Sequence, residues 1–252
     1  MEPTSDTAMA HSWASPSFRP ERIEKLISDV DRYNSQNRSV LLEYLDEQLK
    51  NGTYDALANF AILKLFQLNP TEFGYDAMVN ILIKTLTAAP FPDFSLCISL
   101  LGEAPIAKTS QSNAGSIDSA TGIISEPIVV RLAKLSTALS ETRFREFWAL
   151  YKLPEYEDIR KYTANIAGFE AALRQVVLNS VKGTFRTISE TRLSGYLDLQ
   201  DASFAEYISK QPGWMLSNGL VTVPLNIDNE VKPTVVREEI TQENLSKLLA
   251  QA

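Results

Sequence analysis

Few side chains in this 252-residue chain have the types and spacing that catalysis or metal binding requires. The single histidine, His11, lies in a stretch that we expect to be disordered, so catalysis by a serine–histidine or cysteine–histidine pair is not expected. The single cysteine, Cys97, cannot complete a Cys/His zinc site, and none of the ten glycines forms a G-x-G-x-x-G motif or a P-loop. The carboxylates Glu155 and Glu157 could form a catalytic pair, but nothing distinguishes them from an ordinary run of solvent-exposed charged residues. The sequence therefore predicts a protein that is not an enzyme, with no cofactor and no metal ion.

Composition and charge narrow the class of protein further. The chain carries 24 basic and 31 acidic residues, a formal net charge of −7, which argues against binding to a polyanion. One cysteine cannot form an internal disulfide, and this favours a reducing compartment. No apolar run reaches the roughly 18 residues of a membrane span, and the first residues lack the pattern of a signal peptide. We therefore expect a cytoplasmic protein, with the nucleus as a second location.

The residue pattern predicts a central helix around which the other elements are organised. From Leu57 to Leu68 only three residues are polar, so the helix is apolar on nearly all sides and must be covered on several of them. Asp55 can cap its first turn, and the Asn69-Pro70 dipeptide should stop it.

Further helices with short connections should pack around this one as a helical-hairpin, HEAT-like array over residues 20–163. Apolar residues at three- and four-residue spacing predict the segments 20–33, 35–51, 78–86, 93–101, 127–139 and 144–151. Within the first segment, Val30 and Tyr33 continue the apolar period. Residues 1–19 are rich in Ser, Pro, Thr and Ala and are predicted to be a disordered tail. Residues 108–125 have no apolar period and are predicted to be a flexible insertion.

Residues 164–226 show a different order of elements. A helix ending at Gly183 is followed by an extended piece at 185–188 and a helix at 189–197. A further helix should begin near Asp201, or at Ser203 if Ser203 and Glu206 form a capping box. Asn218-Gly219 then predicts a β-hairpin over 214–225. Helix, strand, two helices and a hairpin are the order of a winged helix, so the fold class is mostly α with a small β-hairpin.

The charges of this winged helix decide what it could bind. Between residues 184 and 225 the basic residues are Arg186, Arg192 and Lys210, against four acidic residues. A DNA-reading helix normally presents clustered lysine and arginine to the phosphates. Groove binding is therefore disfavoured, and the pattern favours a winged helix that binds protein.

Helical hairpins that run into an acidic winged helix resemble the PCI family, whose members occur in the proteasome lid, the COP9 signalosome and translation initiation factor 3. Several short motifs make the chain most similar to the subunit K group of that factor. They are Asp31-Arg32-Tyr33-Asn34, Tyr54-Asp55, Ala58-Asn59, Leu63-Lys64-Leu65, Asn69-Pro70, Asp93-Phe94, Leu96-Cys97, Phe147-Trp148, Gly168-Phe169 and Gly213-Trp214. A proteasome-lid or signalosome subunit, and a winged-helix protein that binds nucleic acid, are the alternatives.

The resemblance implies a non-catalytic scaffold subunit that supports initiation on the small ribosomal subunit. It also implies pairing with a neighbouring PCI subunit, most directly subunit L. Two features at the C-terminal end favour such a contact: the hairpin edge, and a helix over 240–249 within the linker and C-terminal helix of residues 227–252. Both could instead fold back on their own winged helix. The predicted partner-binding residues are Trp214, Val221, Val223, Leu245, Leu248 and Leu249.

Overall fold

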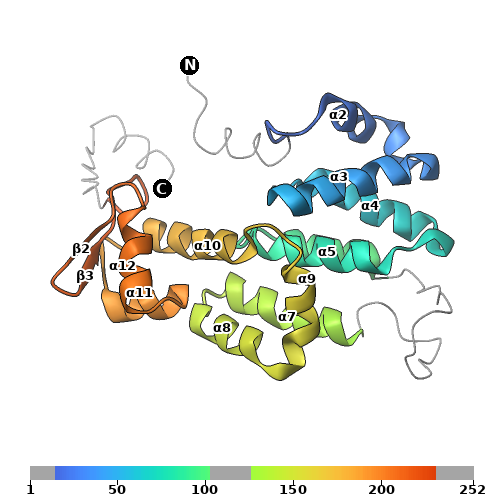
Figure 1. The fold of residues 1–252 in the computed structure, drawn as a ribbon. Helices are drawn as coiled ribbons and strands as arrows, with labels where there is room; N and C mark the ends of the chain where they lie inside the picture. The colour runs from blue at the N-terminus through green and yellow to red at the C-terminus, as the bar shows by residue number, and fades with distance from the viewer. Residues whose placement is uncertain (1–14, 103–125, 231–252) are drawn as a thin grey trace, which may run out of the picture.

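The computed structural model describes residues 15–102 and 126–230. The predicted insertion and the predicted C-terminal helix, with Leu245, Leu248 and Leu249, lie outside the described residues. The described chain is mostly helical, with one small sheet (Figure 1). Its α-helices are α2 (Glu21–Ser28), α3 (Arg38–Asn51), α4 (Ala56–Leu68), α5 (Tyr75–Leu86), α6 (Asp93–Leu101), α7 (Pro127–Ser140), α8 (Phe144–Lys152), α9 (Glu157–Thr163), α10 (Phe169–Thr184), α11 (Glu190–Leu197) and α12 (Asp201–Ser209). Short 3₁₀ helices are η1 (Val30–Tyr33), η2 (Ser35–Asn37), η3 (Pro70–Glu72) and η5 (Pro154–Tyr156), and the strands are β1 (Thr187–Ser189), β2 (Met215–Ser217) and β3 (Leu220–Thr222).

Helix α4 lies at the centre of the N-terminal helices, as its apolar surface predicts. It packs against α2, α3, α5 and α6. Ile62, Leu63 and Phe66 are fully buried, and the Asp55 carboxylate caps the helix by accepting from the Ala58 amide at 3.2 Å. Covering on several sides explains why the helix tolerates apolar residues around most of its circumference.

The first predicted helix is shorter than its apolar period suggests. Helix α2 ends at Ser28, and the Asp29 side chain accepts from the Val30 amide and so caps the 3₁₀ helix η1. Val30 and Tyr33, which continue the period, are 74% and 45% exposed. The prediction that they belong to helix one was therefore wrong, because an aspartate favours the cap of a following helical turn over the interior of a helix.

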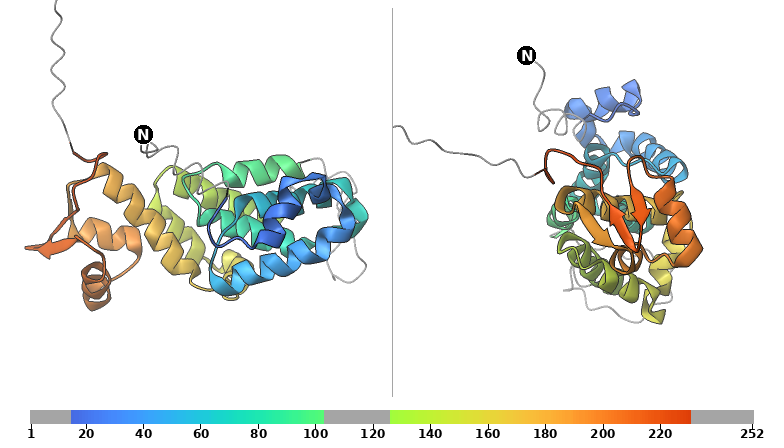
Figure 2. Two further views of the ribbon diagram at one scale, coloured as in Figure 1. Left: turned by 90° about the horizontal axis from the view of Figure 1, so that it is seen from above. Right: turned by 90° about the vertical axis from the view of Figure 1, so that its left-hand side faces the viewer.

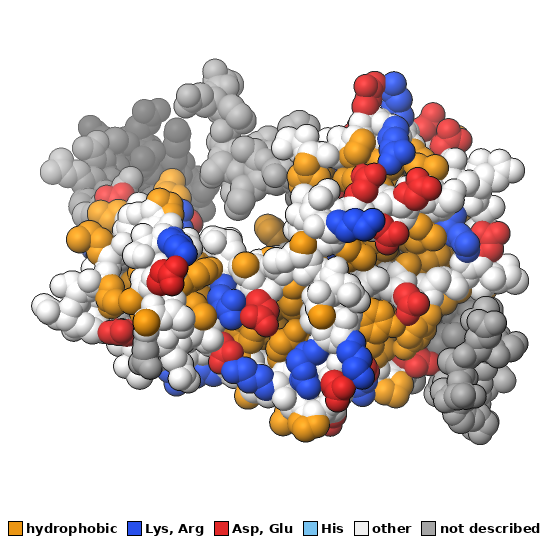
Figure 3. All heavy atoms as spheres, in the orientation of Figure 1, with side chains coloured by type: hydrophobic (Ala, Val, Ile, Leu, Met, Phe, Trp, Pro, Cys, Tyr) orange, Lys and Arg blue, Asp and Glu red, His pale blue; other side chains and the backbone are white. Residues whose placement is uncertain are grey.

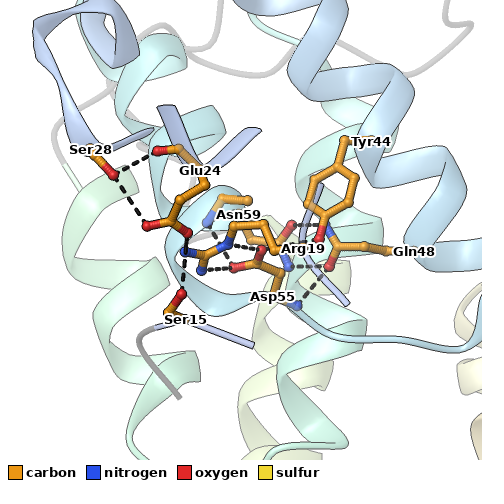
Figure 4. Close-up of polar contacts among 9 residues, drawn as sticks. Ser15, Arg19, Glu24, Ser28, Tyr44, Gln48, Asp55 and Asn59 are labelled. Atoms are coloured by element: carbon orange, nitrogen blue, oxygen red, sulfur yellow. Dashed lines mark hydrogen bonds and ion pairs between the residues drawn. The ribbon is translucent and has the colours of Figure 1, made fainter. Parts of the chain in front are cut away.

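A buried ion pair holds the first described residues to the rest of the array (Figure 4). Arg19 donates from Nε to Asp55 Oδ2 at 2.6 Å and from Nη2 to Asp55 Oδ1 at 2.7 Å, and from Nη1 to Glu24 at 2.6 Å. The Tyr44 hydroxyl donates to the same Asp55 carboxylate at 3.1 Å. Arg19 thus sits in the fold, although the predicted disordered tail extends through residue 19.

The segment from α10 to β3 forms the other end of the molecule (Figure 2). Its element order matches the predicted one, and its three antiparallel strands lie in the order β1–β3–β2. Asn218 and Gly219 adopt positive φ values of 51° and 73°, as the hairpin signal requires. Of the two predicted starts for the next helix, the one near Asp201 is confirmed, because α12 begins at Asp201. Ser203 is not the cap, and its hydroxyl donates to the Gln200 carbonyl.

Donors from α8 and α10 hold the C-terminal end of α11. Trp148 Nε1 donates to the Tyr196 carbonyl at 2.8 Å, and Arg174 Nε donates to the Leu197 carbonyl at 3.1 Å. The last carbonyls of a helix have no partner within it, so these bonds satisfy groups that would otherwise need water. The aromatic stripe of α8, predicted to be core, is buried. Because its Trp148 also bonds to α11, this stripe joins the helical array to the C-terminal end of the molecule.

Candidate protein interface at the C-terminal sheet

The side chains that could act as nucleophiles or acid–base groups are either buried or already paired with a neighbouring side chain. Burial raises the pKa of the fully buried Cys97 thiol, which makes it a poor nucleophile. The Glu157 carboxylate pairs with Lys161 at 3.0 Å, and the hydrogen bond from Lys161 lowers the pKa of this exposed group. Residues 15–102 and 126–230 contain no cluster of three or more His, Cys, Asp or Glu that could hold a metal ion. No helix in these two ranges is long and apolar enough to cross a membrane.

Exposed apolar side chains instead gather at the C-terminal sheet. Five of the large hydrophobic side chains that are exposed in the described chain fall within the thirteen residues 215–227. They are Met215 at 66%, Leu216 at 37%, Leu220 at 50%, Leu225 at 69% and Ile227 at 77% exposure. Figure 3 shows hydrophobic side chains at the surface of this end of the molecule. A concentration of this kind marks a protein contact more often than scattered single residues do.

The pleat of the sheet separates a buried face from an open one. Ile188, Val221 and Leu216 are opposite one another across the three strands, and the first two are buried in the core. On the other face, Met215 is opposite Thr222, and Leu220 is opposite Ser217. These four residues are exposed, so the outer face carries two large apolar side chains. Strand β2 also has a neighbour on one side only among the described strands, so it is an edge strand of the sheet.

The predicted partner-binding residues divide into two groups. Trp214, Val221 and Val223 are 9%, 0% and 2% exposed, so their side chains pack inward and support the sheet. Leu245, Leu248 and Leu249 lie outside the described residues. Met215 and Leu220 were not among the predicted partner-binding residues. The signal was available, because Leu220 directly precedes Val221, and two neighbouring apolar residues in a strand must face opposite sides.

Two of the three cations between residues 184 and 225 are already engaged. Lys210 Nζ pairs with Glu206 at 2.6 Å, and the hydrogen bond from Lys210 lowers the pKa of the Glu206 carboxyl. Arg186 Nε donates to the Asn229 carbonyl at 2.9 Å. This arrangement offers little cationic surface to a phosphate backbone, and it suits a protein partner better.

Comparisons with known proteins show the family to which the chain belongs. The described chain combines a long series of helices with a small sheet whose outer face carries two large apolar side chains. The CSN8/PSMD8/EIF3K family matches residues 72–235. The chain belongs to this family.

Individual relatives place it within the family. The chain is 50% identical to eukaryotic translation initiation factor 3 subunit K from Mycosarcoma maydis, over 98% of this chain and 97% of the relative. It is 35% identical to the subunit K of Botryotinia fuckeliana, over 93% of this chain and 94% of the relative. It is 36% identical to that of Cryptococcus neoformans, over 95% and 94%. The resemblance to the subunit K group is confirmed.

Proposed function

We propose that this protein is a non-catalytic scaffold subunit of translation initiation factor 3 that acts in the cytoplasm and supports initiation on the small ribosomal subunit. The observation that carries the proposal is the 50% identity to a subunit K over nearly the whole of both chains.

The architecture that we propose is of the PCI type. A HEAT-like helical domain over 20–163 precedes a winged helix over 164–226, and 227–252 forms a linker and a C-terminal helix. The order α10–β1–α11–α12–β2–β3 supports the winged-helix assignment, because β1 pairs with β3 and β3 pairs with β2 across the hairpin.

The partner that we propose is a neighbouring PCI subunit, most directly subunit L, and the contact surface is the outer edge and face of the sheet. Met215 and Leu220 supply apolar area there, while Val221 and Trp214 hold the strands from beneath. The leucines Leu245, Leu248 and Leu249 of the C-terminal segment are proposed to join the same contact, since a short helix with one apolar stripe needs a surface to pack on.

Co-purification of the tagged full-length chain from its own cells, followed by mass spectrometry, tests the assembly. Recovery of initiation-factor subunits supports the proposal. Recovery of proteasome-lid or signalosome subunits would overturn it in favour of another complex within the same family.

The proposed contact has a separate test with purified subunit L. Changing both Leu245 and Leu248 to Asp should weaken binding while circular dichroism shows an unchanged fold. Loss of the fold in this variant would mean that the leucines pack within their own chain, and undiminished binding would remove them from the contact.

A further inference from the structure

The loop that follows the sheet, residues 224–230, exposes two large aliphatic side chains. Leu225 is 69% and Ile227 is 77% exposed, and Ile227 is the most exposed large hydrophobic residue of the described chain. Single exposed leucines are common on protein surfaces and need no explanation. Two within three residues of one loop are notable when the loop is also held rigid, because a flexible loop could fold such side chains inward.

Two asparagines fix this loop to the end of α10. Asn229 is 6% exposed, and its Nδ2 donates to the carbonyls of Lys182 at 3.1 Å, Phe185 at 3.2 Å and Pro224 at 3.0 Å. Asn226 Nδ2 donates to the Lys182 carbonyl at 2.8 Å.

The same asparagines also close the loop on itself. Asn226 Oδ1 accepts from the amides of Asp228 at 2.9 Å and Asn229 at 3.1 Å, and Asn229 Oδ1 accepts from the Asn226 amide at 3.0 Å. Arg186 adds a bond to the Asn229 carbonyl. The polar groups of the loop therefore bond inward while Leu225 and Ile227 project into solvent.

We propose that the 224–230 loop is a second docking element, in which Leu225 and Ile227 insert into an apolar pocket on a neighbouring protein subunit. A rigid loop loses little conformational entropy on binding, so its apolar side chains contribute more of their burial energy to affinity. Asp228 is exposed in the same loop, and the chain as a whole carries a net charge of −7. The matching pocket is apolar, with lysine or arginine at its rim.

This inference rests on the proposed function, because the subunit next to the loop belongs to the same assembly. The loop is distinct from the outer edge of β2: it follows β3, and its hydrogen bonds join it to α10 and to Arg186, just before β1. Loss of one contact should therefore weaken assembly without removing the other.

The test replaces the cellular protein with tagged variants and measures how much initiation factor 3 co-purifies with each. Changing both Leu225 and Ile227 to Ser should lower recovery at least about tenfold, the loss typical of central contact residues. Val130→Ser on α7 is the matched control, since Val130 is 40% exposed and lies outside the sheet and the loop; its recovery should equal the parent's. Asn229→Ala keeps both aliphatic side chains but frees the loop, and should lower recovery several-fold.

Each other outcome overturns the proposal. Parent-like recovery of the Leu225/Ile227 variant would show that the loop docks on nothing in the assembly. Normal recovery with a melting temperature lowered by several degrees would show that the side chains pack within their own chain. A parent that is dimeric by light scattering, with a monomeric variant that still assembles, would assign the loop to a second copy. If the parent itself recovers no factor subunits, the proposed function fails and the inference fails with it.

Discussion

Replacing Arg19 by methionine should be among the most destabilising single substitutions in the chain. The guanidinium makes hydrogen bonds of 2.6 and 2.7 Å to Asp55, and the two side chains are 1% and 0% exposed. Methionine keeps much of the apolar stem but leaves the Asp55 carboxylate buried, with the Tyr44 hydroxyl and the Ala58 amide as its donors. Removing one partner of a buried pair costs about 3–5 kcal/mol of folding free energy. For a chain of this size the melting temperature should fall by roughly 6–20 °C.

A double-mutant cycle separates the charge pair from the helix cap. Asn and Asp cap helices about equally well, so Asp55→Asn removes the charge while it keeps a cap for α4. The double variant, with Arg19→Met and Asp55→Asn, buries no unpaired charge from this pair. It should be more stable than the sum of the single effects predicts, by about 1–3 kcal/mol. Glu24→Gln is the control, because the Glu24 side chain is 43% exposed and its pair with Arg19 should contribute less than about 1 kcal/mol.

Urea unfolding followed by circular dichroism measures each free energy, and thermal melts of the same preparations give an independent check. If the Arg19→Met variant melts within about two degrees of the parent, the pair contributes too little for this reasoning to hold. Strict additivity of the two single variants would refute it as well, because a direct pair must show coupling.

Three further predictions follow from the described residues. Leu63 is fully buried in α4, so Leu63→Ala should cost about 2–5 kcal/mol in urea unfolding, and a parent-like variant would show that α4 is peripheral. Burial lowers the pKa of Lys84 to about 8 from its ordinary 10.5, and Lys84 is 1% exposed. Between these pH values the unfolded chain holds a proton that the folded chain has released, so stability should rise with pH. Lys84→Met should abolish this rise and stabilise the protein at pH 7 by up to roughly 3 kcal/mol in the same assay. Finally, the isolated chain should not bind duplex DNA or single-stranded RNA at sub-micromolar concentration in fluorescence anisotropy at physiological salt; binding that is abolished by charge reversal of Arg186, Arg192 and Lys210 would contradict this.

The parts of the fold that depend on neighbouring residues could be predicted from the sequence. The apolar period of α3 identifies its buried side, including Leu41, Tyr44 and Leu45, and Gly52 ends this helix in the left-handed conformation. The Asn218-Gly219 turn likewise needs only two residues that accept positive φ. In each case the determining interactions lie within a few positions along the chain.

Elements that depend on distant partners could not be predicted. Arg19 stands in a stretch whose composition is typical of disorder, and its partner Asp55 is 36 positions away. Helix α9, Glu157–Thr163, was also missed. It is only seven residues long, and isolated helices of that length are unstable in water, so its existence depends on packing against α5 and α7.

The candidate interface shows where a sequence pattern stops being informative about binding. Alternation in 220–223 correctly identifies Val221 and Val223 as one face of a strand, and the structure buries both. The same pattern cannot distinguish an apolar face that packs on its own chain from one that packs on another, because burial has the same driving force in both cases. That distinction comes from the residues that alternate with them along the strands and face the other side of the sheet. Leu220 and Met215 are large and apolar, whereas the rest of the outer face carries Thr and Ser. Both side chains remain exposed in the described chain. An interface hypothesis should therefore begin with apolar residues at positions that the strand period assigns to solvent.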